Sequence, residues 1–505
     1  MNKPQERSIQ SAVAVNLIRT LTLTLLSFIS FPFTARALGA TGMGNYTYAN
    51  TFVYYFLILA KLGIPNLAVR ECAKVRDDQV ALSRKAQGFF IMQLVTTLLS
   101  FGVMCIFLFS LPGIFTEAWF RAVVFLLSIN FLVGAFSFEW FYIALEKHFY
   151  IGLRSVLVAT IGTLLVIGLV KSSRHLHLYA VLAISGTLIT STLNVLMLKR
   201  NGFIFKPLGN YEFKQYLRPV FSIALITLMI TIYNQTDTMI LGALDTSQSS
   251  TGSYSVGIKV VEIVITVLTS MSAIFLPRAT KLIADDNIGE FKKLTAYSNN
   301  LTLLIGLPAV GLIIVLAPEI ISYIVTSSSG YWGPNDVNNA RIALMIVATM
   351  MLTYPLAENI YHQVLLPIGK ERIYLICLTT GVIVNISGAL LLGGVAFKDN
   401  PIIGIALSTL ISDIVVLVPL LIYTRKLTSR AIFNFNSLKI ILAAVAVSLF
   451  AYFITPLFNM SSFLKVVVVG GVSLIIYVTI LLISKENIVR SIIPLGINKG
   501  ENNHE

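Results

Sequence analysis

The chain has 505 residues, a formal net charge of +14 and a mean hydropathy of +0.83, and 56% of its residues are hydrophobic. Only 12% are charged, which is about half the fraction found in soluble domains. This composition excludes an ordinary soluble enzyme and a disordered chain, and it predicts an all-α polytopic membrane protein.

Fourteen apolar segments follow one another along the chain, and each is long enough to cross about 30 Å of hydrocarbon as a helix. Helices are expected because the strands of a membrane barrel would be shorter segments of alternating polarity. The predicted spans are 11–34, 46–65, 86–110, 121–143, 151–170, 178–198, 217–243, 253–277, 295–317, 338–360, 373–395, 402–424, 438–457 and 462–483.

The basic residues between these spans predict the orientation of the chain. With the N-terminus inside, and with the first four residues of a span counted with the loop before it, 27 of the 37 Lys and Arg residues fall in inner segments, 7 in outer segments and 3 deeper inside spans. Cytoplasmic loops carry such an excess, so we expect a multi-pass protein of the bacterial plasma (inner) membrane with both termini in the cytoplasm. The excess faces anionic headgroups, so membrane lipids are expected partners and nucleic acid is not.

An internal repeat divides the chain. Leu38–Ala40 and Gly44–Tyr46 follow the first span, and the similar stretches Leu241–Ala243 and Gly252–Tyr254 follow the seventh. Because six spans separate the copies, they have the same orientation, as in transporters with parallel repeats related by a pseudo-two-fold axis along the membrane normal. The sequence therefore predicts an N-terminal lobe at 1–214, a C-terminal lobe at 215–430, and two accessory helices with a cytoplasmic tail at 431–505.

Three stretches carry a resemblance to a known family. They run from Arg36 to Tyr46, from Glu139 to Lys147, and from Gln363 to Glu371. With the fourteen-span plan, they resemble the Wzx-type O-antigen and capsule repeat-unit flippases of the multidrug/oligosaccharidyl-lipid/polysaccharide (MOP) exporter superfamily. The motif residues, which we expect to mark the fold, are Arg36, Gly39, Gly44, Tyr46, Glu139, Trp140, Glu146 and Gly369.

The resemblance implies two six-helix lobes around a central cavity. It also implies movement of undecaprenyl-pyrophosphate-linked oligosaccharide from the cytoplasmic to the outer leaflet by alternating access, for O-antigen lipopolysaccharide, capsule or exopolysaccharide synthesis. A polysaccharide polymerase or a glycosyltransferase is an expected partner. Such a carrier needs cations for the diphosphate but no catalytic residue, metal or cofactor. The sequence contains no P-loop and no HExxH spacing, so it carries no recognisable ATP or zinc motif.

Ionisable residues inside spans are costly and usually face a cavity. Arg19, with Asn16 nearby in span 1, is the leading candidate for binding the substrate phosphates, and a structural ion pair is the alternative. Lys61 lies near the end of span 2, where snorkelling to the interface competes with substrate contact. Lys259 and Glu262 are three residues apart on span 8 and either pair with each other or serve substrate binding and ion coupling, respectively.

Carboxylates in the second repeat are candidates for ion coupling. Asp237 lies in a polar run that begins at Asn234, where it could bind sugar hydroxyls or carry H⁺ or Na⁺. Hydrogen bonding between helices is the alternative for this residue. Glu358 in span 10 and Asp413 in span 12 are weaker candidates for the same role.

Three other functions compete with the polysaccharide flippase. A drug or small-molecule:cation antiporter of the same superfamily would share the fold, and so would a peptidoglycan-precursor flippase. A membrane polymerase or ligase would typically need a large outer loop with catalytic groups. The longest outer loop expected here, 318–337, has only Glu319 and Asp336 as carboxylates, so we expect a transporter and not an enzyme.

Overall fold

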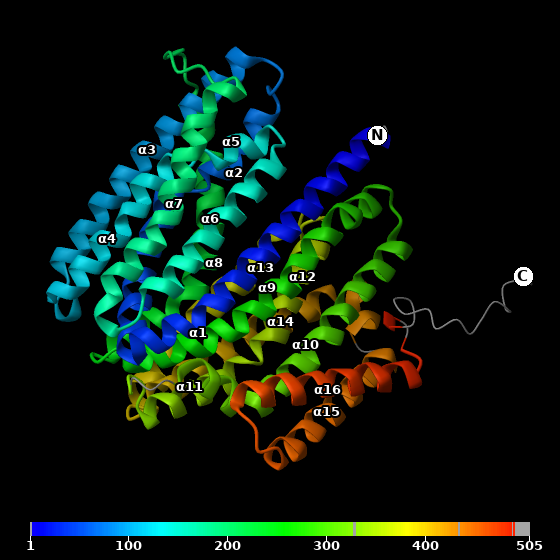
Figure 1. Cartoon of the computed structure of the whole chain (residues 1–505). Helices are drawn as coiled ribbons and strands as arrows, with labels where there is room; N and C mark the ends of the chain where they lie inside the picture. The colour runs from blue at the N-terminus through cyan, green and yellow to red at the C-terminus, as the bar shows by residue number, and fades with distance from the viewer. Residues whose placement is uncertain (1–2, 327–329, 433–434, 487, 490–505) are drawn as a thin grey trace, which may run out of the picture. The chain divides into compact units, whose positions relative to one another are not determined.

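The computed structural model describes residues 3–326, 330–432, 435–486 and 488–489. All regular structure in this part of the chain is helical (Figure 1). The α-helices are α1 (Lys3–Lys61), α2 (Ile64–Ala73), α3 (Gln79–Ser110), α4 (Ala118–Ala135), α5 (Glu139–Ala144), α6 (His148–Leu169), α7 (Leu176–Leu198), α8 (Phe213–Leu244), α9 (Ser249–Ala284), α10 (Ile288–Val325), α11 (Pro334–Val347), α12 (Met350–Ile360), α13 (Glu371–Gly388), α14 (Pro401–Ile432), α15 (Phe435–Ile454) and α16 (Ser462–Ile483).

Thirteen helical segments of the described chain are long and apolar enough to cross a membrane. The first of them contains two of the predicted spans, because the backbone of Gly39 leaves the helical region at φ 71° and ψ 178° and divides α1. An unbroken helix of 59 residues would be ~88 Å long at 1.5 Å per residue, far more than one bilayer. The structure thus confirms a multi-pass, all-α membrane protein and accounts for each predicted span.

Proline acts differently at the two corresponding spans of the repeat. Pro65 stands in the first turn of α2, directly after a break at Leu62 and Gly63, a position that suits its missing N–H. Pro277 instead lies inside α9, which continues to Ala284. The second copy therefore extends as one helix where the first copy is interrupted.

By packing, the chain divides into two compact units. The first comprises 1–256, 324–339 and 385–405, and the second comprises 257–323, 340–384 and 406–505. These units group residues that contact one another, which is not the same as a division into transport lobes. The lobe boundaries expected after residues 214 and 430 therefore stay a prediction.

The two copies of the glycine repeat pack against each other within the first unit. A Cβ atom added to Gly44 would lie 1.8 Å from the carbonyl oxygen of Gln248, and one added to Gly252 would lie 1.9 Å from that of Ala40. Real Cβ atoms do not approach so closely, so only glycine permits this crossing. Gln248 and Ala40 are separated by 208 positions, as are Gly252 and Gly44, so the contact is reciprocal between the copies.

The remaining motif residues have structural contacts of their own. Arg36 donates from Nε to the carbonyl oxygen of Ile324 at 3.2 Å, and Tyr46 packs edge-on against Tyr179 with ring centroids 4.6 Å apart. Trp140 is 3% exposed in an aromatic core with Phe89 and Phe138. Glu146, which pairs with Arg76, and Gly369 have positive φ angles of 57° and 67°.

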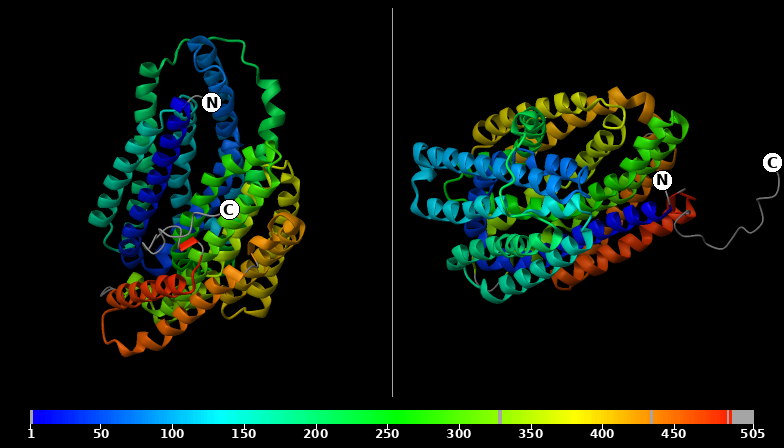
Figure 2. Two further views of the ribbon diagram at one scale, coloured as in Figure 1. Left: turned by 90° about the vertical axis from the view of Figure 1, so that its right-hand side faces the viewer. Right: turned by 90° about the horizontal axis from the view of Figure 1, so that it is seen from above.

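The connection between α7 and α8 is tied to the start of α3. Asp78 caps α3 by accepting from the backbone N–H groups of Val80 and Ala81 at 2.9 and 3.0 Å, which fixes the beginning of that helix. The Gln87 side chain then donates to the carbonyl oxygens of Ile204 and Lys206 at 2.6 and 3.0 Å. Figure 2 shows this connection passing over the end of α3.

In the second unit, α15 and α16 lie side by side (Figure 1). The Ser437 hydroxyl donates to Asn300 at 3.0 Å, and the Tyr477 hydroxyl donates to the carbonyl oxygen of Leu304 at 2.9 Å. Both contacts end on α10, so buried hydrogen bonds attach these two helices to the helix they cover.

Candidate functional site

The carboxylate of Glu139 lies between two arginines of the first unit. Glu139 Oε1 is 2.8 Å from Arg19 Nη2, and Glu139 Oε2 is 3.6 Å from Arg154 Nη2. Glu139 begins the short helix α5, directly after Phe138, whose φ of 45° marks a sharp change in chain direction. The buried Trp140 next to it holds this turn in the aromatic core. The turn thus presents the carboxylate to α1 and α6.

Arg154 is held more firmly than Arg19. Its side chain is 4% exposed, against 24% for Arg19 and 34% for Glu139. Asn194 on α7 accepts a hydrogen bond from Arg154 and donates one to the carbonyl oxygen of Ser137, just before the turn. The Tyr150 ring lies 5.5 Å from the Arg154 guanidinium, within range for a cation–π contact. The network therefore fixes one arginine and leaves the other accessible.

The two guanidinium groups differ in what a ligand can reach. The Nε–H groups of Arg19 and Arg154 are buried and have no hydrogen-bond acceptor among the described residues. A guanidinium has five N–H donors in a planar fork that suits carboxylate and phosphate oxygens. Because both Nε atoms are enclosed by protein, a ligand would reach the cluster through the Arg19 side chain, which is 24% exposed.

Lys61 adds a third positive charge. It stands at the end of α1, is exposed, and interacts electrostatically with Glu139. Three cations around one carboxylate give the cluster a formal net charge of +2. Asn16 is exposed and precedes Arg19 by three positions on α1, so the two side chains share one helix face.

The structure joins Asp237 to neighbouring helices. Asp237 is 6% exposed; its Oδ2 accepts from the Tyr254 hydroxyl at 2.8 Å and its Oδ1 accepts from Asn385 Nδ2 at 3.0 Å. These contacts match the alternative of hydrogen bonding between helices. Asn234, three residues earlier, is exposed. The polar run on α8 therefore has one buried residue, Asp237, and one exposed residue, Asn234.

The candidates of the second unit form three separate contacts. Lys259 Nζ lies 3.0 Å from Glu262 Oε2 on α9, the mutual ion pair that their spacing predicts. Asp413 on α14 accepts from the Thr353 hydroxyl at 2.6 Å. Glu358 on α12 accepts from Tyr374 at 3.0 Å and lies 3.0 Å from His362 Nε2.

Sequence reasoning missed three residues of these clusters. Arg154 is counted with an inner loop because it stands only four residues into a predicted span, but the structure buries it in α6, and its place inside that span is the available signal. Asn194 had no distinguishing signal, because its partners come from other helices. His362 could have been found from its i, i+4 spacing to Glu358, and it lies in a π-helical turn, Tyr361–Leu365, a feature frequent at functional sites.

Comparisons with known proteins define the class of the fold. The solved structure of a lipid II flippase, MurJ in an inward closed conformation, aligns with a TM-score of 0.68 and 17% identity over 96% of this chain and 99% of MurJ. An inward-facing multidrug resistance MATE transporter of the MOP superfamily aligns with a TM-score of 0.60 and 14% identity, over 83% of this chain and 99% of its own. The fold is that of a MOP superfamily transporter.

Sequence comparison identifies the family. Residues 11–283, more than half of the chain, match the polysaccharide biosynthesis protein family, and residues 222–391 match the MatE family. A candidate O-antigen transporter of Escherichia coli (strain K12) is 22% identical over 346 residues, or 68% of this chain and 80% of the relative. The chain belongs to the polysaccharide biosynthesis protein family, which confirms the resemblance seen in its motifs.

Proposed function

We propose that the protein is a flippase that moves undecaprenyl-pyrophosphate-linked oligosaccharide units from the cytoplasmic to the outer leaflet. The cationic cluster of Arg19, Arg154 and Lys61 around Glu139 is the observation that supports this proposal. A diphosphate supplies anionic oxygens for the partly exposed Arg19 guanidinium, and arginine forks bind phosphate oxygens in pairs. The polyprenyl tail can stay in lipid while the polar head crosses.

The net charge of the cluster argues against a carrier of cationic drugs. A site with a formal charge of +2 repels a cation and attracts an anion, and the effect is larger where protein walls exclude water. The fold alone fits a drug antiporter equally well, as the MATE neighbours show. The charge of the cluster is therefore the feature that favours a lipid-linked anionic substrate.

A peptidoglycan-precursor flippase is the second candidate. The similarity to MurJ over 96% of this chain favours it, and the same cluster would suit a lipid-linked phosphate. The two candidates differ in their consequence for the cell. A gene that is essential for growth would favour the peptidoglycan precursor, and a dispensable gene whose loss removes only surface polymer would favour the polysaccharide unit.

Deletion of the gene in its native host tests the proposal. We expect loss of surface polysaccharide, with lipid-linked oligosaccharide trapped on the cytoplasmic leaflet, because the polar head cannot cross hydrocarbon unaided. The sidedness of the lipid-linked units is measured in sealed membrane vesicles with a membrane-impermeant reagent. Normal polymer and normal sidedness, in a strain without a redundant flippase, would overturn the proposal.

We further propose that Asp237 couples transport to H⁺ or Na⁺. Its carboxylate is buried and accepts hydrogen bonds from Tyr254 and Asn385, and ionisable residues inside membrane spans commonly mark ion or proton pathways. We expect Asp237→Asn to abolish the stimulation of transport by an imposed ion gradient. Proteoliposomes with either a pH or a Na⁺ gradient measure this, and Asp285→Asn, at an exposed carboxylate after the end of α9, is the control. Equal stimulation of wild type and Asp237→Asn would refute the coupling role.

A further inference from the structure

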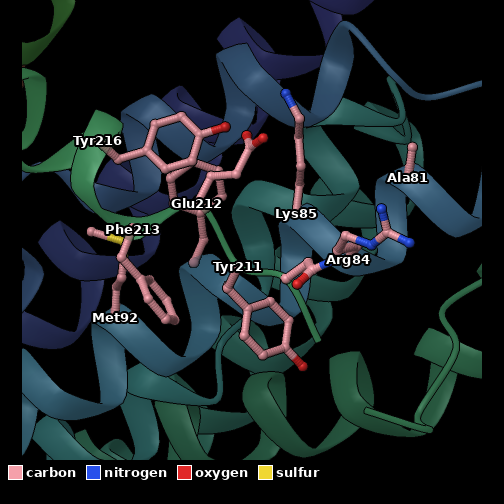
Figure 3. A pocket seen from close by; sticks show the side chains of 11 residues that line it. Ala81, Arg84, Lys85, Met92, Tyr211, Glu212, Phe213 and Tyr216 are labelled. Atoms are coloured by element: carbon pink, nitrogen blue, oxygen red, sulfur yellow. The ribbon is translucent and has the colours of Figure 1, made fainter. Parts of the chain in front are cut away.

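A cavity lies away from the cationic cluster, where α3 meets the start of α8. Its volume is about 280 Å³. One wall is a single face of α3, on which Lys85, Phe89 and Met92 recur at helical spacing. The other wall comes from the segment 210–216, which includes Tyr211, Glu212, Phe213 and Tyr216. Figure 3 shows these side chains around the cavity.

Hydrogen bonds from α3 position the opposite wall of this cavity. Gln87, on a neighbouring face of α3, accepts from the Tyr211 hydroxyl at 2.9 Å and from the backbone N–H of Leu208 at 3.1 Å. These bonds fix the opposite wall at a set distance. Gly88 also lines the cavity, and a Cβ atom placed there would lie 3.6 Å from the Tyr211 ring, in ordinary contact. A longer side chain at position 88 would fill the cavity.

Along α3, the lining of the cavity changes from charged to apolar side chains. Arg84 and Lys85 stand near the N-terminal end of α3, while Phe89 and Met92 lie one to two turns further along the helix and are 1% and 9% exposed. The Phe89 and Tyr216 rings pack with centroids 4.8 Å apart and form the apolar floor. A ligand that fits this gradient has a charged head and an apolar continuation, as a membrane lipid does.

The charges at the rim have both signs. Lys85 Nζ lies 3.5 Å from Glu71, a carboxylate that also pairs with Lys74 at 2.7 Å, so the basic side keeps an excess of positive charge. Glu212 is exposed on the opposite wall, and in Figure 3 its side chain extends in the same direction as that of Lys85. A cation and a carboxylate facing one opening complement a headgroup that itself carries a phosphate and an ammonium group.

We propose that this cavity binds the headgroup of an aminophospholipid of the phosphatidylethanolamine type. The phosphate binds Lys85 and Arg84, the ammonium group binds Glu212 and the face of the Tyr216 ring, and the glycerol region rests on Phe89 and Met92. The proposal goes beyond the flippase function and does not depend on it. A lipid held here would join α3 to the beginning of α8, where the chain passes from the first repeat to the second.

Native mass spectrometry of the purified full chain tests the proposal. The protein is delipidated in detergent and mixed with equal amounts of phosphatidylethanolamine, phosphatidylglycerol and phosphatidylcholine. We expect retention of phosphatidylethanolamine in about tenfold preference, because a charge-assisted hydrogen bond is worth about one such factor. Glu212→Gln should remove the preference over phosphatidylglycerol while lipid is still retained, and Lys85→Gln should reduce retention of all three lipids.

Substitutions that fill the cavity distinguish binding at this site from nonspecific binding of lipid to the protein surface. Gly88→Leu should abolish the preference without changing any charge, whereas Gly88→Ala should preserve the fold and reduce retention only partly. Lys171→Gln, at an exposed lysine away from the cavity, is the control and should behave as wild type. Unchanged preference in Gly88→Leu would overturn the proposal. Displacement of the lipid by equimolar glycerophosphoethanolamine would also overturn it, because the cavity would then recognise a soluble phosphate.

Discussion

Arg19→Ala is expected to reduce translocation of lipid-linked oligosaccharide by about ten- to a hundredfold, the effect of losing charge-assisted hydrogen bonds to a phosphate group. Arg19 is the more accessible of the two arginines that contact Glu139, at 24% exposure, so a ligand can reach it without unfolding the network. Surface polysaccharide in a complemented deletion strain gives the measurement, with membrane insertion checked by immunoblot. Arg174→Ala, at an exposed arginine of the same unit, should leave transport unchanged.

Glu139→Gln distinguishes substrate binding from a purely structural ion pair. This variant removes the carboxylate but leaves both arginines in place. If Arg19 binds the diphosphate, Glu139→Gln should retain binding of a lipid diphosphate, while Arg19→Ala should lose it. Equal loss of binding in both variants, at equal thermal stability, would show that Arg19 serves only as the partner of Glu139 and would remove the phosphate role.

Gly44→Ala and Gly252→Ala are expected to destabilise the protein by about 1–3 kcal/mol each, the usual cost of forcing an extra carbon into a packed contact. The new Cβ atoms would lie 1.8 and 1.9 Å from carbonyl oxygens, and a backbone atom cannot rotate away as a flexible side chain can. Thermal unfolding of the purified protein in detergent, followed by tryptophan fluorescence, gives the measurement.

The matched control for both variants is Gly102→Ala. Gly102 is also inside a helix, but a Cβ atom there would meet nothing within 4 Å. Helical glycine replaced by alanine normally gains about 0.5–1 kcal/mol, so the control should be as stable as wild type or more so. If Gly44→Ala matched Gly102→Ala in stability, the close approach of the two repeat copies would be wrong.

The sequence predicted those features that depend on one helix at a time. Span number follows from hydropathy, and the pairing of Lys259 with Glu262 follows from their spacing on α9. The accessible arginine in span 1 was found because a charge inside a span stands out against its apolar neighbours. These properties are local, so they can be read without knowing which helices become neighbours.

The partners across helices could not be predicted in the same way. Glu139 lies 120 positions from Arg19, and nothing in either local sequence selects the other. Arg154 stands near the start of a predicted span, where boundaries are uncertain by a few residues. Counting it with the neighbouring loop conceals a buried charge. Asn194 acquires its role only through two hydrogen bonds to residues of other segments.

The reciprocal contact between the repeat copies has a consequence for how this chain can vary. Positions 40 and 44 of one copy meet positions 248 and 252 of the other, each glycine against the backbone of the opposite copy. Such an arrangement is isologous, as in a symmetric homodimer. The two glycines therefore belong to one shared contact, and substitutions at positions 44 and 252 should have non-additive effects on stability.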